Sequence, residues 1–275
     1  MLTSDQNRKI NEIVEEFKEA ADFYRMEYSE DLMGMFRDFG CMLLLKCKVD
    51  TEGKADLERL LEGRHKLKGT VKRQLMTVSE ELVQLWAPGE QDGSGDTGEY
   101  EGSQNVREMF QTALEEIFHF CLYSKGGKNR YLLPEETAKP LLRLLTFPEG
   151  MMAGNEGLVV LDTQCGAGSA LMAASRYLKN LRLMGYEKDE EMWAAAVIMS
   201  QLSGLEMELH LEDGARADLY ESCDLVISNP VYGTDTIKDE ELIDQLPGEL
   251  KTVRGRYHTT DDYIGFYQKF LSNQK

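Results

Sequence analysis

The sequence predicts an α/β fold with a mainly parallel, doubly wound sheet, preceded by an all-α helical bundle. In residues 105–275, short apolar runs alternate with segments of helical periodicity, which is typical of βαβ units. In residues 1–87, apolar residues recur at helical spacing. Residues 88–104 are glycine-rich and acidic, so we expect a flexible linker and a domain boundary between the two regions.

The N-terminal region is predicted to be a bundle of amphipathic helices. Apolar residues recur at spacings of three and four around Ile10 and, after a polar break, from 32 to 43. Residues 54–61 and 71–86 predict further helices, and the helix 106–123 leads into the α/β domain. The apolar stripes are most simply explained as the core of the bundle, with docking to a partner as the alternative.

The first strand of the α/β domain is predicted at residues 158–161, a continuous apolar run typical of a central parallel strand. It ends at Asp162. Gly166 and Gly168 follow, where the absence of a Cβ lets the backbone turn tightly and approach a ligand, and residues 169–178 predict a helix. The GxGxxG spacing of dinucleotide-binding folds is absent, and an acid stands four residues before the first glycine instead. The alternative is an ordinary glycine turn with a capping acid.

Two more acids follow the ends of the next two predicted strands. Strand 181–186 ends at Glu187, where a carboxylate can accept hydrogen bonds from both ribose hydroxyls of a nucleoside. After the helix 190–203, strand 207–211 alternates apolar and polar residues, as expected at a sheet edge. Asp213 follows this strand and could receive an adenine amino group. Either acid alone would be interpreted as a solvated surface charge, but their positions at consecutive strand ends favour a binding site.

The fourth predicted strand, residues 225–227, runs into the sequence Ser-Asn-Pro-Val-Tyr-Gly. This sequence resembles the Asn-Pro-Pro-Tyr motif of methyltransferases that act on planar amino groups, and the resemblance implies the following roles. An exocyclic amine shares its lone pair with its ring, so it is a poor nucleophile until two acceptors hold its hydrogens. The side-chain oxygen of Asn229 and the carbonyl of Pro230 would be those acceptors, and Tyr232 would stack on the flat acceptor molecule. The alternative is an ordinary Asn-Pro turn leaving a buried strand.

These motifs resemble those of the N6-adenine DNA methylases, in particular the modification (methylation) subunit of type I restriction-modification systems. The family loop usually reads Asp-Pro-Ala-Cys-Gly-Ser-Gly, and its acceptor motif reads Asn-Pro-Pro-Tyr. Upstream, residues 130–134 resemble the family's Tyr-Tyr-Thr-Pro motif, which contributes to the cofactor pocket. Leu133 stands in place of the Thr of that motif, and Val231 stands in place of the second proline of the acceptor motif.

The resemblance implies a Rossmann-like class I methyltransferase sheet with S-adenosyl-L-methionine as cofactor. It implies an adenine-N6 DNA methyltransferase that flips its target base out of the duplex. The cofactor-binding positions carried over are Tyr131, Asp162, Cys165, Gly166, Gly168, Glu187 and Asp213, and the catalytic positions are Asn229, Pro230 and Tyr232.

Two alternatives remain open. The same amine-holding motif serves enzymes that methylate a glutamine amide in a protein, or RNA. The chain could also be a non-catalytic cofactor-binding or scaffolding remnant of a DNA methylase. The residues after Gly233 predict an acidic loop and a helix rather than the strands that would complete the sheet. We therefore expect a fragment or a naturally shortened relative, whose fourth strand has an unpaired edge that a second copy could cover in a homodimer.

Composition constrains the partners. The formal net charge is −18 at pH 7, whereas phosphate contacts need clustered Lys and Arg, so DNA would have to be held by a basic specificity subunit or a missing recognition region. The 5 cysteines are scattered without a Cys-x-x-Cys pair, which argues against a zinc site and favours a reducing cytoplasm. We identify no signal peptide and no apolar run of membrane-spanning length.

Overall fold

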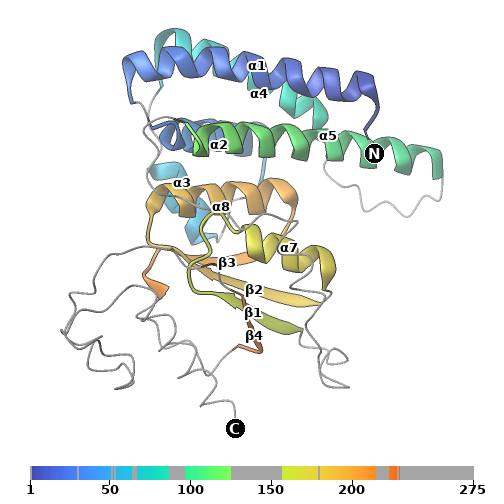
Figure 1. Ribbon diagram of the computed structural model, residues 1–275, viewed down its shortest axis with the longest axis vertical. Helices are drawn as coiled ribbons and strands as arrows, with labels where there is room; N and C mark the ends of the chain where they lie inside the picture. Colours follow the sequence, from blue (N-terminus) through green and yellow to red (C-terminus); the bar gives the residue numbers. More distant parts are fainter. Residues whose placement is uncertain are drawn as a thin grey trace, which may run out of the picture. The chain divides into compact units, whose positions relative to one another are not determined.

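The computed structural model of the chain divides into two compact units, which are described separately (Figure 1). The helical unit comprises Met1–Asn129 and Val197–Gly204, and the α/β unit comprises Arg130–Ala196 and Leu205–Lys275. The residues that the structure describes are 2–29, 31–50, 52, 54–63, 67–86, 97–124, 157–178, 180–214, 223–227 and 229, without side chains for 97–104.

The helical unit confirms the predicted helical N-terminal region. Its helices are α1 (Ser4–Glu27), α2 (Met33–Lys46), α3 (Ala55–Glu62), α4 (Gly69–Leu85) and α5 (Thr97–Leu122). Helix α1 begins with a capping box, in which the Thr3 hydroxyl accepts from the Gln6 backbone and the Gln6 side chain accepts from the Thr3 backbone.

The core of the helical unit is aromatic. The rings of Phe17 and Phe39 lie 5.0 Å apart in an edge-to-face arrangement, and those of Phe36 and Phe118 lie 5.1 Å apart. Phe17, Phe36 and Phe39 are fully buried. The apolar stripes that the sequence places on these helices therefore form a core, as the simpler interpretation predicts.

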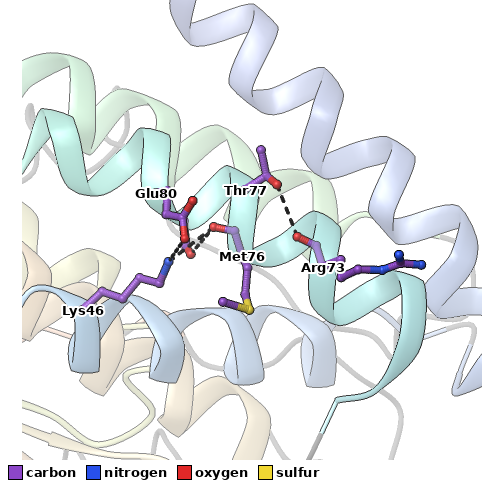
Figure 2. A network of polar contacts seen from close by, with 6 residues as sticks. Lys46, Arg73, Met76, Thr77 and Glu80 are labelled. Carbon is purple, nitrogen blue, oxygen red and sulfur yellow. Dashed lines mark hydrogen bonds and ion pairs between the residues drawn. The ribbon is translucent and has the colours of Figure 1, made fainter.

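Helices α2 and α4 are also joined by a polar network on the surface of the unit, which Figure 2 shows. The ammonium of Lys46, at the end of α2, lies 3.0 Å from a carboxylate oxygen of Glu80 and 3.4 Å from the carbonyl of Met76. One turn away, the hydroxyl of Thr77 donates to the carbonyl of Arg73 at 3.3 Å. Both partners of the ion pair keep contact with solvent, so its net contribution is small.

The last turns of α8 (Glu190–Ser203) belong to the helical unit. A Cβ added at Gly40 of α2 would lie only 2.7 Å from Cγ2 of Ile198. The ammonium of Lys54 donates to the Gln201 side chain at 3.1 Å, and the guanidinium of Arg107 donates to the Ser203 carbonyl at 2.7 Å. Helix α5 packs with α1, α2 and α4, and it begins inside the segment predicted as a linker. The predicted boundaries at 1–87, 88–104 and 105–275 remain predictions.

The α/β unit contains a parallel sheet with the strand order β3-β2-β1-β4 among the residues described. Within the described part of the sheet, β3 lies at an edge, as its alternating sequence predicts, and β4 pairs with β1. The strands are β1 (Leu158–Asp162), β2 (Leu181–Tyr186), β3 (Met207–His210) and β4 (Leu225–Val226), and helix α7 spans Ser169–Tyr177.

Helix α7 and the first turns of α8, up to Ala196, lie along one face of this sheet (Figure 1). On that face, the indole N–H of Trp193 donates to the carbonyl of Leu209 at 3.3 Å. On the other face, Leu161, Met184 and Tyr186 form a small apolar cluster. In the described part of the chain, no helix combines the length and apolar character that crossing a bilayer requires.

Candidate functional site

The loop after β1 is bent by local hydrogen bonds. Asp162, at the end of β1, is 1% exposed, and its carboxylate accepts from the Gln164 N–H at 3.0 Å. The Cys165 N–H donates to the carbonyl of Tyr186 at 2.9 Å, which fastens the loop to the end of β2. The two predicted positions Asp162 and Cys165 are therefore part of one ordered turn.

The two glycines of this loop adopt backbone conformations that other residues avoid. Gly166 has φ +55 and Gly168 has φ +80, and Gly168 is the N-cap of α7. For an L-residue the left-handed conformation costs about 1–2 kcal/mol. A Cβ at Gly166 would lie 3.5 Å from the methyl of Met192, so α8 supports the loop from the side. The predicted glycine positions are thus required by backbone geometry.

Glu187, directly after β2, is hydrogen-bonded to the loop. One of its carboxylate oxygens accepts from the Gly166 N–H at 2.9 Å, and the other accepts from the Asp189 N–H at 2.7 Å. Burial raises the pKa of Glu187 above its ordinary value of 4.5, while the backbone N–H groups of Asp189 and Gly166 act to lower it. A carboxylate can accept about four hydrogen bonds. Glu187 therefore retains acceptor capacity for the hydroxyl groups of a ligand.

Asp189 is a site residue that the sequence interpretation missed. Its carboxylate accepts from the backbone N–H groups of Glu191 at 3.0 Å and Met192 at 3.1 Å, so it caps the first turn of α8. The sequence contains the pattern that predicts this role, because an acid just before an apolar helical segment is a common N-cap.

The thiol of Cys165 is 4% exposed and packs against the backbone of β2, where a Cβ at Gly185 would lie 2.9 Å from its sulfur. Burial raises the pKa of Cys165 well above its ordinary value of 9.0, and the charges of Asp162 and Glu187 raise it further. The side chain is therefore a neutral packing group beneath the loop.

The segment after β3 approaches the same loop. Gly214 is buried, and a Cβ there would collide with the carbonyl oxygen of Thr163. The preceding residue, Asp213, is half-buried, and its carboxylate lies 3.7 Å from the ammonium of Lys188. Because Gly214 touches the loop and Lys188 follows Glu187, Asp213 lies near the glycine loop and the end of β2.

The acceptor motif begins at the neighbouring strand end. Val226 of β4 is paired with Leu161 of β1, and the Ile227 N–H donates to the Leu161 carbonyl at 2.9 Å. Asn229 follows and is half-buried. Asn229 and Asp162 thus leave the sheet from adjacent parallel strands at the same end. Pro230, Tyr232 and Tyr131, like Leu133 and Val231, lie outside the described residues.

The arrangement fits a nucleoside-containing cofactor. Asp162 ends β1, whereas Glu187 and Asp213 follow the ends of β2 and β3, so the three acids lie at the same end of three adjacent strands, beside the glycine loop. Within the described residues, no group of His, Cys, Asp and Glu side chains is arranged to hold a metal ion.

Comparisons with known proteins agree with this fold. A family model described as N-6 DNA Methylase matches residues 106–272. A structure described as a class I S-adenosylmethionine-dependent methyltransferase from Listeria monocytogenes is similar, with a TM-score of 0.59 and 15% identity over 97% of this chain and 70% of that one. The type I restriction-modification system methyltransferase subunit from Streptococcus thermophilus is also similar, with a TM-score of 0.51 and 14% identity over 94% of this chain and 72% of that one. No curated protein sequence matches the chain. The predicted Rossmann-like class I methyltransferase fold is confirmed.

Proposed function

Because the chain belongs to the N-6 DNA methylase family, we propose that it transfers a methyl group from S-adenosylmethionine to the N6 amino group of adenine in DNA. The observation that carries this proposal is the pairing of β1 with β4. This pairing supports the proposal because Asp162 and Asn229 leave the sheet at the same end of adjacent parallel strands, where we propose that the methyl donor and the methyl acceptor meet.

The cofactor would supply a methyl group made electrophilic by the sulfonium to which it is bonded. We propose that the carboxylate of Asp162 binds the cationic amino-acid end of the cofactor. The carboxylate of Glu187 would bind the ribose hydroxyls, and that of Asp213 would bind the adenine amino group. The remaining proposed contacts come from the loop and from the upstream motif, at Tyr131, Cys165, Gly166 and Gly168.

The acceptor amine would be held by the motif after β4. The Asn229 side-chain oxygen and the Pro230 carbonyl each accept a hydrogen bond from the amine, which leaves the nitrogen lone pair free to attack the methyl carbon. Tyr232 stacks on the base and keeps it in line with the methyl group. The base has to leave the duplex for this geometry, which costs a few kcal/mol of unstacking.

DNA binding would need a basic surface that this acidic chain does not itself supply. The formal net charge of −18 opposes binding of phosphates by this chain alone. We propose that a basic specificity subunit or a further recognition region binds the DNA phosphates. We also propose that the protein acts in the cytoplasm, where DNA and the cofactor are both present. A homodimer through an exposed strand edge remains a proposal for the assembly.

Two experiments test this function. Calorimetric titration with S-adenosylmethionine should show stoichiometric binding, and radiolabel should then pass from the cofactor to an adenine-containing duplex when a basic specificity partner is supplied. Asn229→Ala should lower the transfer rate about 10²- to 10³-fold, as expected for loss of one preorganised polar contact, without weakening cofactor binding. Cofactor binding without transfer to any acceptor would identify a non-catalytic remnant.

Methylation of a protein glutamine amide is the second candidate, because an acidic chain repels nucleic acid but does not repel a neutral or basic protein. The same radiolabel experiment separates it. Label that appears on protein and never on DNA or RNA would replace the leading substrate with a protein acceptor.

A further inference from the structure

The glycine loop is held by a hydrogen bond between two groups of the protein itself. The Gly166 N–H donates to a carboxylate oxygen of Glu187 at 2.9 Å, across 21 positions of sequence. The proposed ribose role of Glu187 does not require this bond, because hydroxyl groups could be received by a carboxylate that is free of the loop. The bond therefore needs a separate explanation.

The carboxylate of Glu187 is itself held from the opposite side. Its second oxygen accepts from the Asp189 N–H at 2.7 Å. Asp189 in turn is fixed to the first turn of α8 by its bonds to the Glu191 and Met192 N–H groups. The result is a continuous chain of hydrogen bonds from the loop through Glu187 to α8.

The loop needs such a restraint because of its composition. Glycine loses more conformational freedom on ordering than any other residue, and Gly166 and Gly168 both occupy the left-handed region. The nearest group to a Cβ placed at Gly166 is the methyl of Met192 at 3.5 Å, an ordinary van der Waals distance, and such a contact is not directional, so it does not hold the Gly166 N–H in one orientation. A hydrogen bond to a charged acceptor is among the stronger restraints available to a backbone N–H group.

We propose that Glu187 is a positioning residue that holds the glycine loop in its bent conformation in the free protein, in addition to receiving the ribose. The ribose part of this statement rests on the proposed function, whereas the loop part does not. Once the loop is held in this way, the cofactor meets a preformed site, and the cost of ordering the glycines is met during folding instead of during binding.

The loop role is tested without any ligand by hydrogen exchange of single backbone amides, followed by nuclear magnetic resonance. In Glu187→Ala, the Gly166 and Asp189 amides should exchange about tenfold to a hundredfold faster, the factor expected for loss of a bond to a charged acceptor. The Cys165 amide, which is bonded to the Tyr186 carbonyl, should keep its protection. Unchanged exchange at Gly166 would overturn the proposal.

Matched variants separate the carboxylate from a general change of charge. Glu212→Gln removes the same charge from an exposed residue after β3 and should leave the Gly166 amide unchanged. If Glu187→Ala does not fold, Glu187→Gln replaces it, because one amide oxygen cannot serve both N–H groups and its NH₂ group opposes the second donor. Either the Gly166 or the Asp189 amide should then lose protection, and full protection of both would refute the loop role.

A cofactor analogue separates the two roles of Glu187. If the residue only receives the ribose, an S-adenosylmethionine analogue lacking both ribose hydroxyls should bind equally to the wild type and to Glu187→Ala. If it also holds the loop, the analogue should bind the variant about tenfold more weakly. A protein that binds neither compound would defeat the proposed function, while the exchange experiment would still decide whether Glu187 holds the loop.

Discussion

The two units of the chain hold their charged side chains in different ways. In the helical unit, many described ion pairs join residues one turn apart, such as Lys18 with Glu15 and Arg25 with Asp22, and at least one partner of each is well exposed. In the α/β unit, Asp162 and Glu187 leave strand ends and accept backbone N–H groups of one loop. An exposed charge of the first kind can be exchanged at little cost, whereas an acid of the second kind has a fixed partner. The comparison indicates where substitutions will affect function rather than stability.

The largest effect is expected in the core of the helical unit. Phe36 is fully buried against Phe118, so Phe36→Ala should destabilise the fold by about 3–5 kcal/mol through lost burial and an unfilled cavity. Denaturant unfolding followed by circular dichroism measures this loss. Under conditions where the variant is folded, its affinity for S-adenosylmethionine should match that of the wild type. A loss below about 1 kcal/mol would contradict the assignment of this residue to a packed core.

A matched pair of glycine substitutions compares the two units directly. Gly168 and Gly69 both have left-handed backbones, with φ +80 and φ +61. Alanine at either position should cost about 1–2 kcal/mol of stability from backbone strain. Only Gly168→Ala should also weaken binding of S-adenosylmethionine, about tenfold or more, because it displaces the loop. Calorimetry on both variants checks this difference, and equal losses of affinity would remove the distinction between the two positions.

A smaller effect comes from the ionisation of Glu187. Because its pKa is raised in the folded protein, the folded state binds more protons than the unfolded state at pH values just above 4.5. The contribution of this group to stability is therefore largest below pH 4.5, and it falls as pH rises from 4.5 through the raised pKa. Around it, Asp189 and Cys165 are the titratable groups to which its charge is coupled. When the free energy of unfolding is measured as a function of pH, this decrease should be absent in Glu187→Gln. A pH profile identical to that of the wild type would be evidence against the raised pKa.

The smallest effect is expected at the ion pair between α2 and α4. Lys46→Ala removes the contacts to Glu80 and Met76 that Figure 2 shows. Since both partners of the ion pair are partly exposed, the loss should be at most about 0.5 kcal/mol and should shrink in high salt. Thermal unfolding at two salt concentrations measures it. A loss of stability as large as that expected for a core residue would contradict the view that exposed ion pairs contribute little in this unit.

Local patterns in the sequence were sufficient to predict most of the described helices and strands and the position of the glycine loop. Helical spacing predicts α1, α2, α4 and α5, and the apolar run ending at Asp162 predicts β1 with the loop behind it. These features depend on residues that are neighbours in the chain, or one turn apart, so a single sequence contains them.

The features that were missed depend on contacts between distant parts of the chain. The close approach of Gly214 to Thr163 is visible only once β3 and β1 are placed in one sheet. The grouping of Val197–Gly204 with the helical unit depends on residues such as Gly40 and Arg107, which no local pattern connects to α8. The start of α5 at Thr97 was hidden by an acidic, glycine-rich composition that is unfavourable for a helix.

The contact between Gly40 and the side chain of Ile198 has a consequence for protein engineering. A chimaera that exchanges the N-terminal helices of two relatives by recombination within residues 88–104 would separate Gly40 from its native neighbour and place a foreign side chain against the α2 backbone. Transplanting α5 and Val197–Gly204 together with those helices would keep the helical unit whole, so the segments to be exchanged are discontinuous in the gene.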